Sequence, residues 1–281
     1  MSKIGTLLAS VALVAFAFSP ATAQYVCVYA PNPPTIDADL SDWQDESGNF
    51  YANPLVFNDR QQCVRGQDNW QSTWDLSGTV YLMWDDSNIY IAAEVLDNVV
   101  TIAYKEGYTR GGAFDEPVGF RIDCRSDAVQ IALDPENGAR TEPGWAVMVD
   151  ICPVQVPEFD QIEIVQMNMG EADISDEGAV VASRETEHGY IVEAMVPTSL
   201  WVNAFGVTVQ PVDGLELLME AILSDCDDGE SRHCMMLHHR NDVDGPNSWY
   251  QGPENMEPII FVKFPTAVSS GSWAEIKALF R

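Results

Sequence analysis

The chain has 281 residues, of which 43 are acidic and 14 are basic, so its formal net charge is −29. Such an anionic chain repels the phosphates of nucleic acids and of acidic lipids, and the composition therefore disfavours both as partners. It favours neutral or cationic partners, such as sugars, calcium ions or basic proteins.

The first 23 residues resemble a secretory signal peptide. Lys3 gives a positive start, residues 4–18 are mostly apolar, and Ala21 and Ala23 form an A-x-A cleavage site. The apolar run is short for a membrane span, and no later segment is apolar enough to predict one. We therefore expect cleavage before Gln24 and a secreted protein, either extracellular or periplasmic.

Residues 24–264 are predicted to form one β-rich domain. Short segments in which apolar and polar residues alternate predict strands. They cover residues 79–84, 89–96, 128–134, 145–151, 163–168, 179–185, 189–197, 215–225 and 258–264. Turn sequences such as DPENG separate several of them, and residues 98–127 form a long connection of the kind that often carries function. The pattern predicts an all-β fold, an antiparallel β-sandwich with two sheets, as in immunoglobulin-like architectures.

The hairpin LMWDDSNIYIAAEVLDN at residues 82–98 shows how acidic residues gather at strand ends. Trp84 is expected in the core, because it shares a side of its strand with Val80 and Leu82. Asp85 suits the turn, where a carboxylate can accept backbone hydrogen bonds. Asp97 ends the second strand and is instead a candidate metal ligand.

The tail, residues 265–281, is predicted to be a small polar linker followed by a short C-terminal helix. Ser272 and Glu275 have the spacing of a capping box, and Trp273, Ile276 and Phe280 share one helical face. Two interpretations stay open: the helix docks on a protein partner, or it packs on the sandwich.

Six cysteines follow the expected cleavage site, namely Cys27, Cys63, Cys124, Cys152, Cys226 and Cys234. An even number in an exported chain predicts disulfides. The simplest local pairing is Cys27–Cys63, Cys124–Cys152 and Cys226–Cys234.

Acidic loops predict that calcium is bound, because calcium takes about six to eight oxygen ligands from carboxylates, carbonyls and water. Besides Asp97, three loops offer closely spaced carboxylates, and no loop completes an EF-hand. The candidate ligands are Asp37, Asp97, Asp225, Asp227, Asp242 and Asp244.

The order of several short motifs resembles the family 9 carbohydrate-binding modules and their wider group of DOMON-like β-sandwiches. The motifs are PTIDADLSDW, LMWDDSNIYIAAEVLDN, SDAVQIALDPENG, EHGYIVEAMVP, SDCDDGESRH and NSWYQGPENMEPIIF, and they span residues 34–264. Ile36, Asp37, Leu40 and Trp43 match the family's opening pattern I-D-G-x-L-D-x-x-W, with Ala38 in the place of its glycine.

This resemblance implies a non-catalytic module that accompanies glycoside hydrolases and binds neutral polysaccharide or oligosaccharide, with structural calcium. Family members hold a sugar between two Trp rings, since the C–H faces of sugars pack on aromatic rings. By this resemblance Trp249 is the second ring, Asn247 hydrogen-bonds the sugar, and Gln130 takes the place of a sugar-binding carboxylate. Arg232 is a further candidate contact.

The sequence departs from the family at the first sandwiching Trp, where it has Cys124. Four other aromatic side chains are candidates for a replacement, namely Trp70, Trp74, Phe114 and Phe120.

Other functions also stay open. The segment RHCMMLHHR could bind haem or copper in an electron-transfer module of the DOMON-like kind, and a structural role in the cell envelope is a further alternative. The chain has no G-x-S-x-G, H-E-x-x-H or P-loop motif, so we predict that it is not an enzyme.

Overall fold

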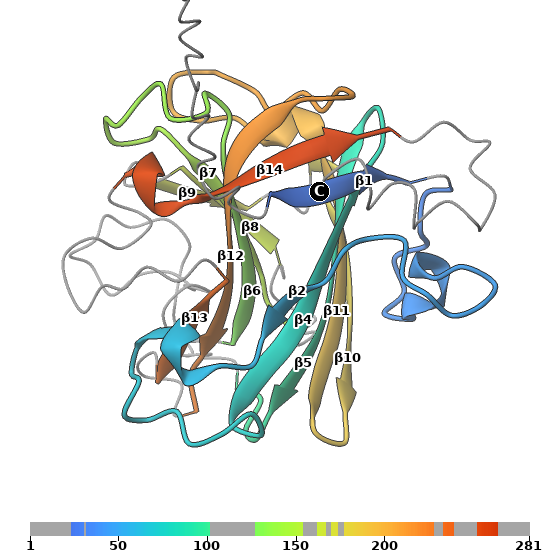
Figure 1. Ribbon diagram of the computed structural model, residues 1–281, viewed down its shortest axis with the longest axis vertical. Helices are drawn as coiled ribbons and strands as arrows, with labels where there is room; N and C mark the ends of the chain where they lie inside the picture. Colours follow the sequence, from blue (N-terminus) through green and yellow to red (C-terminus); the bar gives the residue numbers. More distant parts are fainter. Residues whose placement is uncertain are drawn as a thin grey trace, which may run out of the picture.

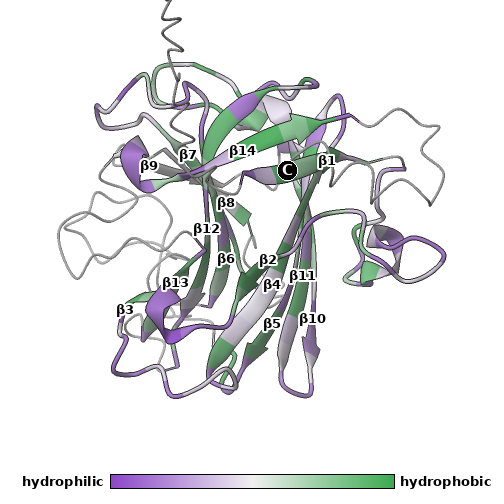
Figure 2. Ribbon diagram, viewed as in Figure 1, coloured by the Kyte–Doolittle hydropathy of each residue, from purple (hydrophilic) through white to green (hydrophobic). Residues whose placement is uncertain are grey.

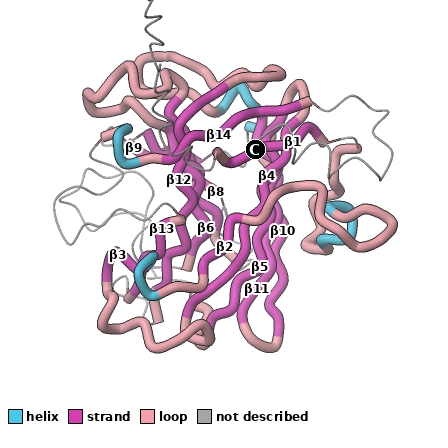
Figure 3. Tube along the Cα trace, in the orientation of Figure 1, coloured by secondary structure: helices cyan, strands magenta, loops and turns pink. Residues whose placement is uncertain are grey.

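The computed structural model describes residues 24–30, 32–101, 127–153, 162–166, 170–173, 177–227, 233–238 and 252–263. Strands dominate these residues, and their helical segments are short 3-10 turns such as η1 (Leu40–Trp43), as Figure 3 shows. Among these residues no helix is long and apolar enough to cross a membrane.

The strands follow one another in a single hydrogen-bonded path whose two halves pack face to face (Figure 1). The first half contains β10 (Val180–Thr186), β11 (Gly189–Pro197), β5 (Asn88–Asp97) and β4 (Leu76–Trp84), with β2 (Leu55–Phe57) also paired to β4. The second half contains β14 (Glu257–Val262), β12 (Glu216–Asp225), β6 (Ala128–Asp134), β7 (Val147–Ile151), β8 (Ile162–Gln166) and β9 (Gly170–Asp173). On this side β13 (Cys234–Leu237) pairs with β12, and β3 (Cys63–Arg65) pairs with β13.

Strand β1 (Tyr25–Tyr29) joins the two halves. It pairs with β14 along Tyr25–Val28 and with the end of β4 at Met83 and Trp84, and it is parallel to both neighbours. The other strand pairs are antiparallel. The prediction of an antiparallel β-sandwich is thus confirmed, with β1 as a parallel exception.

The main hydrophobic core fills the space between the halves. Val80, Leu82 and Ile91 come from one half, Val129 and Leu223 from the other, and all five are fully buried. Gly78 on β4 lies where the two halves pack closely against each other, since an added Cβ would lie 3.1 Å from Leu223 Cδ1 on β12. Figure 2 shows hydrophobic residues along the strands and hydrophilic residues in many loops, as two packed sheets require.

In the hairpin of residues 82–98, Trp84 and Asp85 have the predicted positions. Trp84 is buried in the main core with Val80 and Leu82, and its Nε1 donates to the carbonyl of Cys27 at 3.2 Å. Asp85 makes the turn, because its Oδ1 accepts the backbone N–H groups of Ser87 and Asn88, each at 2.7 Å.

A small second core holds the N-terminal segment against the first half of the sandwich. Trp43 is fully buried there, and its Nε1 donates to Glu193 Oε1 at 2.6 Å. Glu193 Oε2 accepts the backbone N–H of Asp37 at 3.1 Å. Ala38 has a φ of 62°, in the left-handed region, which explains why the related family pattern has glycine there.

The structure contains no disulfide among the described cysteines, and Cys27, Cys63 and Cys234 are buried thiols. The predicted cysteine pairing therefore stays a prediction. Cys63 hydrogen-bonds Cys234, from a strand more than 160 residues later, and not Cys27. Cys124 and the predicted C-terminal helix lie outside the described residues.

Candidate functional site

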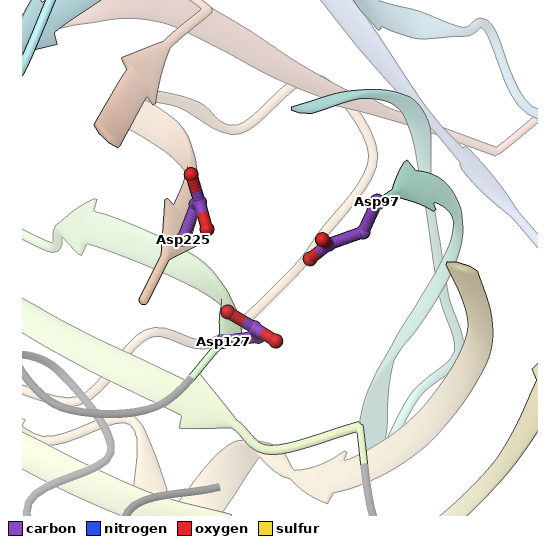
Figure 4. Close-up of side chains that lie close together, drawn as sticks. All are labelled: Asp97, Asp127 and Asp225. Carbon is purple, nitrogen blue, oxygen red and sulfur yellow. The ribbon is translucent and has the colours of Figure 1, made fainter. Parts of the chain in front are cut away.

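Three aspartates gather at one end of the sandwich (Figure 4). Asp97 is the last residue of β5, Asp225 is the last residue of β12, and Asp127 directly precedes β6. Each continues a row of inward-facing core side chains, because residues two apart on a strand share a face. One oxygen of each carboxylate lies within 4.8 Å of the others, and we call this group the carboxylate cluster.

Backbone N–H groups donate hydrogen bonds to Asp127 and Asp97. Asp127 accepts from the N–H of Thr101 and from that of Cys226, the latter at 2.8 Å. Asp97 Oδ1 accepts from the N–H of Val99 at 2.9 Å. Asp97 Oδ2 and Asp225 Oδ1 are buried and lack any hydrogen-bond partner.

Asp227 lies close enough that its charge raises the pKa of all three carboxyls. Its Oδ2 is bonded to His233 Nδ1 at 2.9 Å, and its Oδ1 is buried without a partner. A fourth carboxylate therefore adjoins the cluster, and the buried unpartnered oxygens come from Asp97, Asp225 and Asp227.

The protein environment disfavours the negative charge of the cluster. Burial, followed by mutual repulsion, raises the pKa of Asp97 to about 8 and that of Asp225 to about 9. Burial likewise raises the pKa of Asp127 to about 7. Within the described ranges no Lys or Arg forms an ion pair with these three side chains. Among the described residues, therefore, no Lys or Arg balances the charge of these carboxylates.

The donor set fits a hard divalent cation. All the converging atoms are carboxylate oxygens, which calcium and magnesium prefer, whereas zinc favours nitrogen and sulfur ligands. The unpartnered oxygens of Asp97, Asp225 and Asp227 are suitable extra ligands, because burying such an atom without a partner costs about 1 to 3 kcal/mol.

A row of buried polar side chains lies on the opposite face of the second half-sheet. Gln130 on β6 stands directly opposite Asp150 on β7, and Glu220 on β12 lies one pair further along the same face. All three are at most 1% exposed. Gln130 Nε2 has no hydrogen-bond partner, so this face holds an unused donor between two carboxylates.

The geometry can be compared with known proteins. Residues 58–262, more than half of the chain, match the model of the family described as "Carbohydrate family 9 binding domain-like". The chain belongs to this family. No curated protein is similar enough to add a further match.

Solved structures of carbohydrate-binding module family 9 share the fold. One from Caldicellulosiruptor kristjanssonii in complex with cellotriose is 18% identical, with a TM-score of 0.55, and the match covers 88% of this chain and 97% of that one. The same organism's module in complex with glucose is also 18% identical, with a TM-score of 0.54 and coverages of 87% and 99%. A putative carbohydrate-binding protein from Bacteroides uniformis is 11% identical, with a TM-score of 0.53 and coverages of 84% and 97%.

The structure brings together only some of the predicted metal ligands. Asp97 and Asp225 meet as candidates for one site, and Asp227 adjoins them. Asp37 does not belong to the cluster, since its Oδ1 accepts the N–H of Asp39 in the N-terminal turn. Asp242 and Asp244 lie outside the described residues.

Asp127 is a candidate ligand that the sequence did not predict. It directly precedes a strand and shares a strand face with the inward-facing Val129 and Ile131, and this position could have identified it. Asp97, Asp127 and Asp225 all lie at strand ends with inward-facing side chains, and only the pairing of distant strands shows that they meet.

The predicted sugar contacts are largely outside the described residues, namely Trp249, Asn247 and Arg232, together with Cys124, Phe114 and Phe120. Gln130 is described and lies in the polar row. Trp70 is half-buried and donates to the carbonyl of Leu76 at 2.8 Å, which gives it a structural role. Trp74 is 60% exposed and contacts the His188 ring edge to face.

The candidate haem or copper ligands on β13 have other partners. Met236 is buried in the main core, and Met235 packs in a smaller cluster on the outer face of the sheet. His238 Nδ1 is bonded to Glu257 Oε1 at 2.6 Å, and its ring packs against Phe57. These contacts explain the residues as packing elements of the family 9 fold.

Proposed function

We propose that this protein is an exported, non-catalytic module that binds neutral polysaccharide or oligosaccharide and carries calcium in the carboxylate cluster. The observation that carries the proposal is the membership of the chain in the carbohydrate family 9 binding domain-like family. Two solved modules with this fold are complexes with cellotriose and with glucose, and a β-linked glucan is accordingly the first ligand class to test.

The polar row supports a sugar as ligand. A sugar hydroxyl both donates and accepts, so it can pair with the unused Nε2 donor of Gln130 and with carboxylates beside it. Gln130 is only 1% exposed, and contact with a ligand therefore requires the surrounding chain to open. Trp249, with Asn247 beside it, supplies the aromatic surface on which a sugar ring stacks.

Calcium supports the site indirectly in this proposal. Asp97, Asp127 and Asp225, with Asp227, hold the cation, and its charge offsets the repulsion between the carboxylates. Because Asp97 belongs to one half of the sandwich and the other two to the second half, a bound cation fastens the sheets together.

Export and association with glycoside hydrolases complete the proposal. The signal-peptide pattern of residues 1–23 supports export. A net charge of −29 keeps the module away from acidic surfaces and suits a partner without charge.

Calorimetry with cello- and xylo-oligosaccharides tests the function. We expect binding in calcium buffer and about a tenfold weaker affinity for Trp249→Ala, because a covered indole contributes roughly 1 to 2 kcal/mol. Phe205→Ala, which removes an aromatic side chain that is 42% exposed, should leave the affinity unchanged. Equal binding by both variants contradicts the assigned contact, whereas no binding of any sugar contradicts the function.

A further inference from the structure

Two thiols from distant parts of the chain meet between strands β3 and β13. Cys63 is the first residue of β3 and Cys234 the first of β13, and Met236 stands opposite Cys63 in the antiparallel pairing. Cys63 and Cys234 both face the main core, with exposed fractions of 2% and 0%. The register shifts between Met235 and Met236, and the two thiols hydrogen-bond each other.

We propose that Cys63 and Cys234 form a disulfide bond in the mature protein. Two thiols that hydrogen-bond each other from paired strands have adjacent sulfur atoms, and both side chains face the same core, as a disulfide between them requires. The proposal rests on this contact and on the pairing of β3 with β13, and it does not depend on sugar or calcium binding. It replaces the local pairing of Cys63 with Cys27 and of Cys234 with Cys226.

The hydrogen bond also gives the two sulfurs different roles. The Cys234 thiol lowers the pKa of Cys63, whereas the hydrogen bond to Cys63 and burial raise the pKa of Cys234. Cys63 Sγ further contacts the carbonyl of Arg65 at 3.0 Å. Cys63 is therefore the thiol that more readily becomes the nucleophilic thiolate.

The oxidant in this proposal is a small or protein disulfide, such as oxidised glutathione or a disulfide oxidoreductase. The Cys63 thiolate attacks one donor sulfur, the donor S–S bond breaks, and one donor thiol leaves. Cys234 then loses its proton, and its sulfur displaces the second donor thiol to form the Cys63–Cys234 bond. The protein gives up two electrons and two protons, and the donor disulfide becomes two thiols.

The access of the oxidant to the two sulfur atoms determines when the bond can form. Both sulfurs are buried, but β3 has three residues and pairs only with β13 among the described strands. Exchange therefore takes place before β3 docks on β13 or while it is detached. Once formed, the bond closes a loop that contains most of the domain, which restricts the unfolded chain strongly.

Peptide mapping of the full chain, folded in a glutathione redox buffer, tests the proposal. We expect a cross-linked pair of peptides that contains Cys63 and Cys234 and separates on reduction. In denaturant, where burial no longer protects them, both cysteines should resist alkylation before reduction and accept it afterwards. Alkylation of both without reduction, or a bond from Cys63 to any other cysteine, overturns the proposal.

Variants give a second measurement. Without reductant, Cys63→Ala and Cys234→Ala should each lower Tm by on the order of 10 °C, and the double variant should lower it no further. With reductant most of this difference should vanish. Cys27→Ala removes an equally buried core thiol as control, and its effect should not depend on reductant. Additive effects that are insensitive to reductant contradict a disulfide.

Discussion

At the scale of single residues, Glu193 explains why the N-terminal motif of the chain ends in a Trp. Its side chain is buried and accepts from the indole of Trp43 at 2.6 Å and from the N–H of Asp37 at 3.1 Å. The guanidinium of Arg184 donates hydrogen bonds to the carbonyl of Ala38, which follows Asp37 in the turn. The motif is therefore a structural anchor, and the backbone of Asp37 takes part in it.

Trp43→Phe should lower the free energy of unfolding by about 2 kcal/mol. The substitution removes the Nε1 donor and leaves a buried carboxylate oxygen of Glu193 without that partner. Trp74→Phe is the matched control, because Trp74 is 60% exposed, and its effect should stay within about 0.5 kcal/mol. Urea unfolding of both variants measures the difference, and equal stabilities would show that the Trp43–Glu193 bond does not anchor the segment.

At the scale of strands, period-two alternation predicted β4, β5, β6 and β11 well, and β11 has the predicted bounds. Five strands were missed, namely β1, β2, β3, β9 and β13, and all five have at most five residues with weak or no alternation. Strand β13 shows the physical reason. Cys234 and Met236 face one core cluster and Met235 and Leu237 another, so both of its faces are apolar.

The sequence alone could not show that the carboxylate cluster forms. Asp97 was predicted as a ligand from its place at a strand end and Asp225 from its acidic loop, but nothing local relates them to one another. They meet because β5 and β12 end at the same side of the sandwich, which depends on pairings between strands far apart in sequence. The contact between Cys63 and Cys234 likewise joins distant strands, whereas proximity in the chain was the only guide to the predicted cysteine pairing.

Gly78→Ala should destabilise the protein by about 1 to 3 kcal/mol. An added Cβ would lie 2.8 Å from the carbonyl oxygen of Glu94 on β5 and 3.1 Å from Leu223 on β12, so strands must move apart. Thr79→Ala, on the other face of the same strand, is the control and should cost under about 1 kcal/mol. Thermal unfolding compares them, and a larger loss for Thr79→Ala would argue against close packing at Gly78.

At the scale of the whole molecule, the requirement for a cation should depend on pH. In the metal-free protein the folded-state pKa values of Asp97, Asp127 and Asp225 lie at about 8, 7 and 9, above the unfolded value of about 3.9. The folded state therefore binds more protons than the unfolded state in this window. The stability from these groups is complete below about pH 4 and is lost as pH rises toward 9.

Calcium should thus stabilise the protein more at about pH 8.5 than at about pH 5, where protons already neutralise the cluster. Calorimetric scans with calcium or EDTA at both pH values measure the difference in Tm. Asp225→Asn should reduce the calcium effect, and Asp68→Asn, at a fully exposed carboxylate, should not. A calcium effect that is equal at both pH values, or absent, would contradict a cation in the cluster.

The position of β1 has a consequence for how the molecule opens. β1 ties the halves together near the Trp84 end of β4, whereas Asp97 pairs with Leu76 at the opposite end of the same hairpin. The halves are thus joined by backbone hydrogen bonds at one end, and in the proposed calcium-bound state by carboxylate contacts to the cation at the other. Removing calcium should let the carboxylate end open while the β1 end stays closed. Hydrogen exchange should then accelerate around Val95–Asp97 and Leu223–Asp225, and remain slow in β1 and β14.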